Sequence, residues 1–353
     1  VRGILVTEGV RGDGGTLRNS EGKRFMFDYI TDYFRAETAE TEEEADAWYE
    51  DKSNRRTPDL LPRDEVARAI NAEVKAGRGS PHGGVFLDIA SRRGAEYIAR
   101  RLPSMHHQFK ELADVDITKE PMEVGPTCHY IMGGVRVEAE TTATTVPGLY
   151  AAGEVAAGLH GANRLGGNSL SDLIVFGRRA GLSAAQYVQS LSGHVSPDDG
   201  EIEQHAQELL APFNNDGGEN PYTIHMALQE CMQNLVGIIR TESELKQAQT
   251  EIASLKERLT KVTVEGHRQY NPGWNLALDL QSLLTVAEAT TMGALERKES
   301  RGGHTREDHP GPDPDKFGKI NLVLRRKDGE FSLSEEPLAD MPDDLKELFE
   351  ESK

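Results

Sequence analysis

One turn of the sequence gathers side chains that are suited to binding an anion. His160, Asn163 and Arg164 stand among glycines in the run HGANRLGGNSL, just before a helix-forming stretch. Glycines let a backbone approach a flat ligand closely, and the first N–H groups of a helix favour negative charge. A guanidinium in the same turn can clamp a carboxylate through two parallel hydrogen bonds. This turn is therefore predicted to bind an anionic cofactor atom or a substrate carboxylate.

Two further places carry useful side chains, and each also has a plainer explanation. Thr7 and Glu8 follow the apolar opening stretch, where such residues often only form a turn. Arg63 precedes Asp64 and Glu65, which offer it ordinary surface ion pairs. In the functional interpretation, the guanidinium of Arg63 lies at the edge of a binding site.

The run PTCHYIMGG contains His129 among residues of low polarity. Such a histidine is commonly a hydrogen-bonded residue of a core or turn. The adjacent glycines Gly133 and Gly134 favour instead a loop that faces a ligand. The local residues leave both interpretations open.

The elements that position these side chains follow from periodicity and capping signals. A strand is expected at residues 4–6, with a hairpin up to about residue 26. A run of apolar residues at 146–153 predicts a buried strand that ends at Glu154. The remaining predictions before residue 190 are helices at 64–76, 95–101 and 169–187 and a strand at 85–89. Strand, glycine turn and helix in succession is a layout that holds a cofactor at a helix N-terminus.

Residues 200–300 are predicted to be almost entirely helical. A capping box at 241–244 precedes apolar residues that recur every three or four positions up to residue 262. That stripe fits either a coiled-coil seam or packing within an antiparallel helical domain, and its length of under three heptads favours packing. A hairpin is expected to turn at Asp328 and Gly329.

Composition excludes several classes of protein. The 353 residues predict two or three packed units. The net charge of −19 lies mainly in the acidic stretches 36–51 and 328–353 and argues against a nucleic-acid surface. The stretch 36–51 is taken as solvated and is assigned no chemistry. Two cysteines exclude a disulfide framework or a cysteine-rich metal site, so no metal is predicted.

The motifs together closely resemble those of the flavoprotein subunit of succinate dehydrogenase and fumarate reductase. The segments are GILVTEGVRGDGGTL, LPRDEVARAI, GPTCHYIMGG, GLYAAGEV, HGANRLGGNSLSDLIVFGRRAG and ESRGGHTRED, in the family's order. L-aspartate oxidase shares the Arg-Asp and HGANRL-type motifs, whereas PTCHY favours the succinate and fumarate branch.

The resemblance implies a role for each motif residue. Arg63 matches the arginine that moves a proton to or from a substrate carbon, and we add the hypothesis that Asp64 or Glu65 relays that proton. The residues that match the substrate-binding site are Thr7, Glu8, His129 and Arg164. The residues that match FAD contacts are Glu154, Arg164, Asn168, Ser169 and Leu170. The segment 301–304 matches a motif near the cofactor-side junction.

The resemblance also implies an α+β multidomain fold. Its expected parts are a capping domain at 1–128, a returning segment of a Rossmann-like FAD domain at 129–192, an antiparallel helical domain at 193–310 and a small region at 311–353. The family's GxGxxG fingerprint for the FAD diphosphate is not found in the sequence. The chain is therefore expected to be the C-terminal portion of an FAD-dependent enzyme of this family, lacking the N-terminal FAD-binding half; absence of that half can leave the isolated chain inactive.

The implied activity is the oxidation of succinate to fumarate, or its reverse, with FAD as cofactor. A hydride passes to N5 of FAD, and electrons continue to an iron–sulfur subunit, then to a quinone at membrane anchor subunits, as in respiratory complex II. The implied location is peripheral, on the cytoplasmic face of the bacterial inner membrane or the matrix side in mitochondria. A nucleic-acid partner is not expected. The alternatives are an L-aspartate oxidase-like flavoenzyme and a truncated, non-catalytic binding module.

Overall fold

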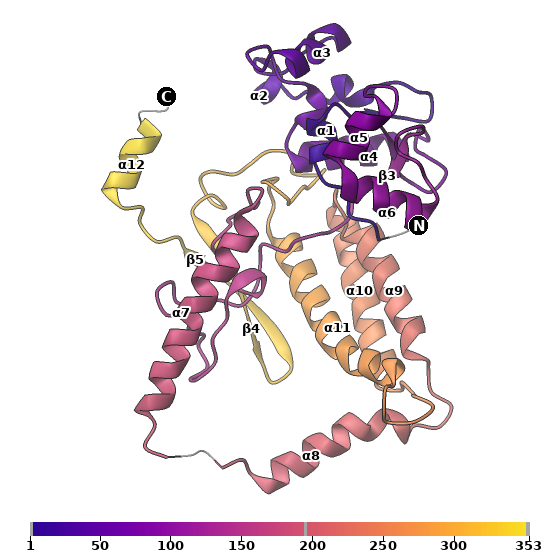
Figure 1. The fold of residues 1–353 in the computed structure, drawn as a ribbon. Helices are drawn as coiled ribbons and strands as arrows, with labels where there is room; N and C mark the ends of the chain where they lie inside the picture. Colours follow the sequence, from indigo (N-terminus) through magenta and orange to yellow (C-terminus); the bar gives the residue numbers. More distant parts are fainter. Residues whose placement is uncertain (1–2, 194–195, 351–353) are drawn as a thin grey trace. The chain divides into compact units, whose positions relative to one another are not determined.

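The computed structural model describes residues 3–193 and 196–350 and divides into two compact units, Val1–His129 and Tyr130–Lys353 (Figure 1). Both helices and antiparallel strands occur, so the expected α+β multidomain class is confirmed.

The first unit is built on a three-stranded antiparallel sheet. The strands are β1 (Thr16–Arg18), β2 (Val85–Asp88) and β3 (Met122–Val124), in the order β1-β2-β3. Leu87 pairs with Leu17 on one side and Met122 on the other, and all three are buried in the core. The helices of this unit are α1 (Gly9–Gly12), α2 (Asp32–Arg35), α3 (Glu42–Glu50), α4 (Arg63–Lys75), α5 (Ala95–Arg101) and α6 (Pro103–Ala113), with 3₁₀ turns η1 (Phe25–Tyr29) and η2 (Pro58–Leu60).

Local signals predict the middle of this unit well and its start poorly. The helices α4 and α5 and the strand β2 confirm the predictions at 64–76, 95–101 and 85–89. The predicted strand at residues 4–6 is wrong, and so is the hairpin, because β1 is followed by a turn and by η1. Phe25 and Met26 are fully buried there, so packing of these side chains favours a tight 3₁₀ turn over extended pairing.

The second unit has a core of three helices that lie side by side (Figure 1). They are α9 (Pro221–Leu235), α10 (Glu242–Leu259) and α11 (Pro272–Glu296). The predicted capping box is present, with Thr241 and Glu244 bonding each other's backbone N–H groups. The apolar stripe is buried inside this unit, as expected for packing within a helical domain; its fully covered members include Leu245, Ala248, Ile252 and Leu255.

The rest of the second unit consists of separate helices and one hairpin. The helices are α7 (Asn168–Ser190), α8 (Asp199–Leu210) and α12 (Asp343–Glu350), with 3₁₀ turns η3 (Gly153–Val155) and η4 (Ala211–Phe213). The strands β4 (Ile320–Lys327) and β5 (Glu330–Pro337) confirm the hairpin that turns at Asp328.

The predicted buried strand at 146–153 is wrong. Val146 and Leu149 are 55% and 52% exposed, and the segment makes only a single bridge, between Ala143 and Tyr150. An apolar run predicts burial, but a strand also needs a neighbouring strand to pair with. Glu154 lies in η3, after that segment.

Two searches of the described residues gave no result. No helix in residues 3–193 or 196–350 is long and apolar enough to cross a membrane. The same part of the chain holds no group of three or more His, Cys, Asp or Glu side chains that could bind a metal ion.

Candidate functional site

The first cluster of candidate residues lies where two helices of the first unit begin. Glu8 immediately precedes α1, and Arg63 is the first residue of α4. The Arg63 Nε donates a hydrogen bond to Glu8 Oε2 at 3.0 Å, although Arg63 is 55% exposed. Thr7 Oγ1 accepts a hydrogen bond from the N–H of Gly9 at 3.2 Å. The cluster therefore presents a hydroxyl and a carboxylate-bound guanidinium within reach of solvent or a ligand.

The expected partners of Arg63 bind another arginine. Arg68 lies 3.1 Å from Asp64 and 2.7 Å from Glu65 along the first turns of α4. The carboxylate that accepts a hydrogen bond from Arg63 is that of Glu8. The relay through Asp64 or Glu65 stays a prediction, and the contact with Arg63 adds Glu8 as a further candidate.

Arg11 also lies in this cluster, and it was not among the site residues predicted from the sequence. Its guanidinium donates to the backbone carbonyl oxygen of Asp59. Burial lowers the pKa of Arg11, while the charge of Glu8 raises it and that of Arg63 lowers it again. The spacing of three residues between Glu8 and Arg11 is the signal that was available, because such residues share a helix face. An arginine in this environment gives up its proton more readily than one in water.

The second cluster surrounds the N-terminus of α7 in the second unit. Gly167 precedes the helix at φ +87°, a conformation that glycine adopts without strain, and no side chain caps the first turn. Asn168, Ser169 and Leu170 form that turn. Leu165 and Leu170 are 74% and 68% exposed beside it. The N–H groups of Asn168 and Leu170 make long bonds of 3.3 Å to the carbonyl oxygens of Leu165 and Gly167. A helix start without a side-chain cap, next to exposed apolar side chains, fits a flat cofactor ring that carries partial negative charge on one edge.

Arg164 is held in the same turn by an aromatic side chain. Its guanidinium carbon lies 4.4 Å from the ring centre of Tyr130, whose edge meets His160, and His160 Nε2 lies 3.3 Å from Asp172. The Arg164 Nη1 donates to the carbonyl oxygen of Leu165 at 3.3 Å. Its Nε is buried and finds no hydrogen-bond partner in the described part of the chain. The guanidinium is thus oriented and retains a donor for a ligand carboxylate.

The remaining two candidates lie on irregular segments. Glu154 is exposed, and its Oε1 accepts a hydrogen bond from the N–H of Ile131 at 3.0 Å. His129 is exposed and ends the first unit. The structure therefore places Thr7, Glu8, Arg63 and His129 in the first unit and Glu154, Arg164, Asn168, Ser169 and Leu170 in the second.

The segment 301–304 braces the loop that carries Arg164. The N–H of Gly303 donates to the carbonyl oxygen of Ala162 at 3.0 Å. Two contacts of the His304 ring hold the segment in place. Its Nδ1 lies 2.9 Å from an Nη of Arg240, and its Nε2 lies 3.0 Å from the carbonyl oxygen of Arg297. Burial lowers the pKa of His304 to about 4, so the imidazole is neutral at pH 7.

Replacing Gly302 with alanine is expected to loosen this brace. Gly302 has φ +56°, and a Cβ there would lie 2.5 Å from the carbonyl oxygen of Ala162. The backbone conformation alone costs a residue with a side chain about 1–3 kcal/mol. We expect a lower midpoint of thermal unfolding and weaker flavin retention in Gly302→Ala. The matched control is Gly311→Ala, because no described heavy atom lies within 4 Å of its Cβ position; equal behaviour of the two variants would contradict the brace.

Two family models match the sequence. The model of an FAD binding domain matches residues 1–170, and the model "Fumarate reductase flavoprotein C-term" matches residues 225–346. The first match includes every candidate residue that the resemblance assigns to substrate or FAD.

Relatives and solved structures agree with these matches. A fumarate reductase (CoM/CoB) subunit of Methanothermobacter marburgensis is 42% identical, over 92% of this chain and 54% of its own. The succinate dehydrogenase flavoprotein subunit of Coxiella burnetii is 35% identical, over 92% of this chain and 53% of its own. The structure of Mycobacterium smegmatis Sdh1 in complex with UQ1 is 55% identical with a TM-score of 0.82, over 100% of this chain and 55% of that one. E. coli quinol fumarate reductase FrdA is 34% identical with a TM-score of 0.80, over 96% and 57%.

The chain spans about half the length of the curated relatives that it matches.

Proposed function

The chain belongs to the family of succinate dehydrogenase and fumarate reductase flavoprotein subunits, and from this we propose that it interconverts succinate and fumarate with the family's cofactor, FAD. The observation that carries the proposal is the hydrogen bond from Arg63 to Glu8 at the start of α4. It joins a guanidinium to a carboxylate within the two motifs, VTEG and LPRD, that the resemblance assigns to substrate binding and proton transfer.

We propose that the turn before α7 holds the flavin ring. Bound FAD supplies a hydride acceptor, its N5 atom. The uncapped first turn of α7, with Asn168, Ser169 and Leu170, suits the part of the ring that becomes negative on reduction. Glu154 and Arg164 complete the proposed contacts.

The dicarboxylate substrate would be bound through its carboxylates. Arg164 keeps a buried Nε donor without a partner in residues 3–193 and 196–350, which supports a role in clamping one carboxylate. Thr7 and His129 are assigned to substrate carboxylates by the resemblance. A carboxylate that is held by fixed donors orients the carbon next to it, which lowers the entropic part of the barrier.

The proton would move between a substrate carbon and Arg63. Arginine is normally protonated throughout the working range of pH, so a proton that leaves Arg63 must be exchanged with a neighbouring group quickly. Glu8 accepts a hydrogen bond from Arg63, and Arg11, with its lowered pKa, lies on the same face of α1. We propose the route Arg63, Glu8, Arg11 for this exchange.

The names of the relatives support a proposal for the path of electrons after the flavin. Several are named as flavoprotein subunits, and one carries the name 8-methylmenaquinol:fumarate reductase. We propose that electrons pass to an iron–sulfur subunit, then to a quinone at membrane anchor subunits, with this chain peripheral on the cytoplasmic or matrix side. In this proposal residues 1–128 form a capping domain, residues 129–192 belong to the FAD domain and residues 193–310 form the helical domain.

Steady-state turnover tests the proposed function. Purified protein in its flavin-loaded form should reduce an artificial electron acceptor with succinate and should oxidise a reduced dye with fumarate. Turnover of L-aspartate without turnover of succinate would establish the aspartate oxidase alternative. A colourless protein that turns over neither substrate would favour the non-catalytic module.

A further inference from the structure

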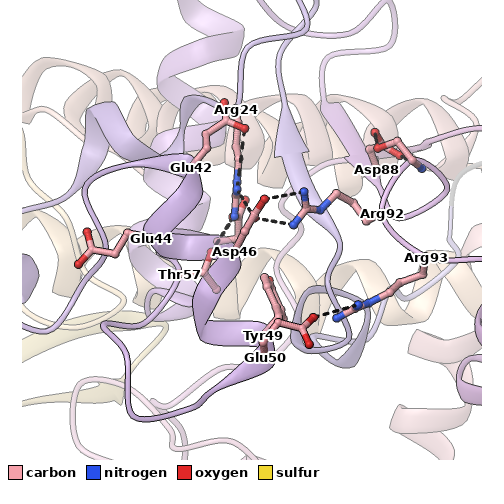
Figure 2. A network of polar contacts seen from close by, with 12 residues as sticks. Arg24, Glu42, Glu44, Asp46, Tyr49, Glu50, Thr57, Asp88, Arg92 and Arg93 are labelled. Atoms are coloured by element: carbon pink, nitrogen blue, oxygen red, sulfur yellow. Dashed lines mark hydrogen bonds and ion pairs between the residues drawn. The ribbon is translucent and has the colours of Figure 1, made fainter.

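Several side chains of the acidic helix α3 contact the rest of the first unit, and two of them, Asp46 and Tyr49, lie on its inner face. The sequence predicted a solvated run without a role, but Ala45 is fully buried and Tyr49 is half-buried. Asp46 and Tyr49 are three residues apart and therefore lie on one face of the helix. Figure 2 shows Asp46 between Arg24 and Arg92, with Tyr49 one turn further along.

Tyr49 contacts the main chain of Arg11. Its hydroxyl donates a hydrogen bond to the carbonyl oxygen of Arg11 at 2.8 Å. Burial raises the pKa of Tyr49 to about 12, so the hydroxyl keeps its proton and remains a donor. The same carbonyl oxygen also accepts from the N–H of Gly14 at 3.2 Å, so loss of the hydroxyl leaves it one partner.

Asp46 reaches the guanidinium of Arg11 through two intermediate residues. Its carboxylate accepts hydrogen bonds from Arg24 at 3.0 Å and from Arg92 at 2.8 Å. Arg24 is buried and donates from Nε to the carboxylate of Asp59 at 2.9 Å. The carbonyl oxygen of Asp59 in turn accepts the hydrogen bond from Arg11. The helix α3 therefore contacts the main chain of Arg11 directly and is linked to its guanidinium through Arg24 and Asp59.

Arg11 needs such support because α1 is too short to hold it. The helix has four residues, and its N-cap residue Glu8 makes no capping hydrogen bond through its side chain. A single helical turn is unstable by itself, since nucleation costs more than its few hydrogen bonds return. The position of Arg11 must therefore be fixed by contacts from outside α1.

We propose that α3 is a strap that positions Arg11 for proton transfer, with Tyr49 holding its main chain and Asp46 supporting its guanidinium through Arg24 and Asp59. The proposal rests on the proposed function, because it takes Arg11 as the end of the route from Arg63. Tyr49 and Asp46 act through Arg11 and are positioning residues. Displacements of about 1 Å in groups that react can cost two orders of magnitude in rate. A small shift of Arg11 should therefore lower the turnover rate measurably.

Two substitutions test the strap in the flavin-loaded protein. Tyr49→Phe and Asp46→Asn should each lower kcat by about three- to ten-fold, the equivalent of one or two hydrogen bonds, while KM changes less than about two-fold. The solvent isotope effect on kcat should rise, because proton transfer becomes a larger part of the barrier. The matched control is Tyr29→Phe, which removes a hydroxyl that donates to Glu73 in the same unit and should leave kcat and the isotope effect unchanged.

Several results would overturn the strap. They are an unchanged kcat in both variants, an equal loss in Tyr29→Phe, or a rise in KM at constant kcat. Hydrogen exchange of the amides of residues 9–13 gives a readout without turnover, and it should accelerate in Tyr49→Phe but not in Tyr29→Phe. Failure of the proposed function is distinguishable, because it is seen as absent succinate turnover before any substitution. In that case unchanged exchange in Tyr49→Phe would still refute the strap.

Discussion

Replacing Arg63 with lysine is expected to lower kcat for succinate oxidation by about 10²–10⁴-fold, the usual contribution of one group in general acid–base catalysis. The flavin should remain bound, because Arg63 is not among the proposed ring contacts, which are Glu154, Arg164 and the first turn of α7. Lysine keeps the positive charge but presents a compact ammonium in place of a planar fork, so it cannot reproduce the geometry toward both Glu8 and a substrate carbon.

The control for Arg63→Lys is Arg35→Lys. Arg35 also forms an exposed ion pair in the first unit, with Asp32 at 3.3 Å. That substitution should leave kcat within about two-fold of the original, since exposed pairs contribute little. Near-normal turnover in Arg63→Lys would refute the assignment of proton transfer to Arg63. Loss of the flavin from Arg63→Lys would show that Arg63 has a structural role and not a role in proton transfer.

Replacing Arg164 with methionine is expected to raise KM for succinate by about 10- to 100-fold, because a hydrogen bond to a charged group contributes about 1.5–3 kcal/mol. Methionine retains an apolar contact with the ring of Tyr130 but provides no donor for a carboxylate. Inhibition by dicarboxylates should weaken by a similar factor, whereas a neutral acceptor dye should be reduced with an unchanged KM.

The control for Arg164→Met is Arg179→Met on α7. Arg179 also lies near an aromatic ring, 5.3 Å from the centre of Phe176, and it pairs with Glu140 at 3.2 Å. Both variants remove one positive charge and one cation–π contact from the second unit. An equal rise in KM in the two would mean that only the overall charge matters, which would contradict the clamp.

The parts of the fold that follow from local rules were predicted from the sequence. The helix α4 has acids in its first turn and an apolar face, and α10 has its capping box, so the start of each was located to within a residue. The strand predicted at 146–153 is wrong because it depends on more than local rules. Its composition indicates burial, but the structure leaves Val146 and Leu149 exposed, because pairing and cover depend on segments distant in sequence.

The candidate site was predicted where a motif carries several unusual residue types together. The turn with Arg164 is such a case, and it precedes an uncapped helix as expected. Arg11 was missed because its spacing of three residues from Glu8, the one local signal, is too common in sequences to indicate a site. Tyr49 and Asp46 were missed because the charges around them on α3 predict a solvated face. Only the fold shows that these two side chains point inward.

The central claim is most directly tested by an anaerobic titration of the flavin absorbance of the purified protein. Addition of succinate should bleach the oxidised flavin band, and addition of fumarate to the reduced protein should restore it. The same titration with Arg63→Lys should bleach at least about 10²-fold more slowly while the initial spectrum is unchanged. A protein whose flavin band does not respond to succinate or fumarate, or an Arg63→Lys variant that bleaches at the original rate, would contradict the account.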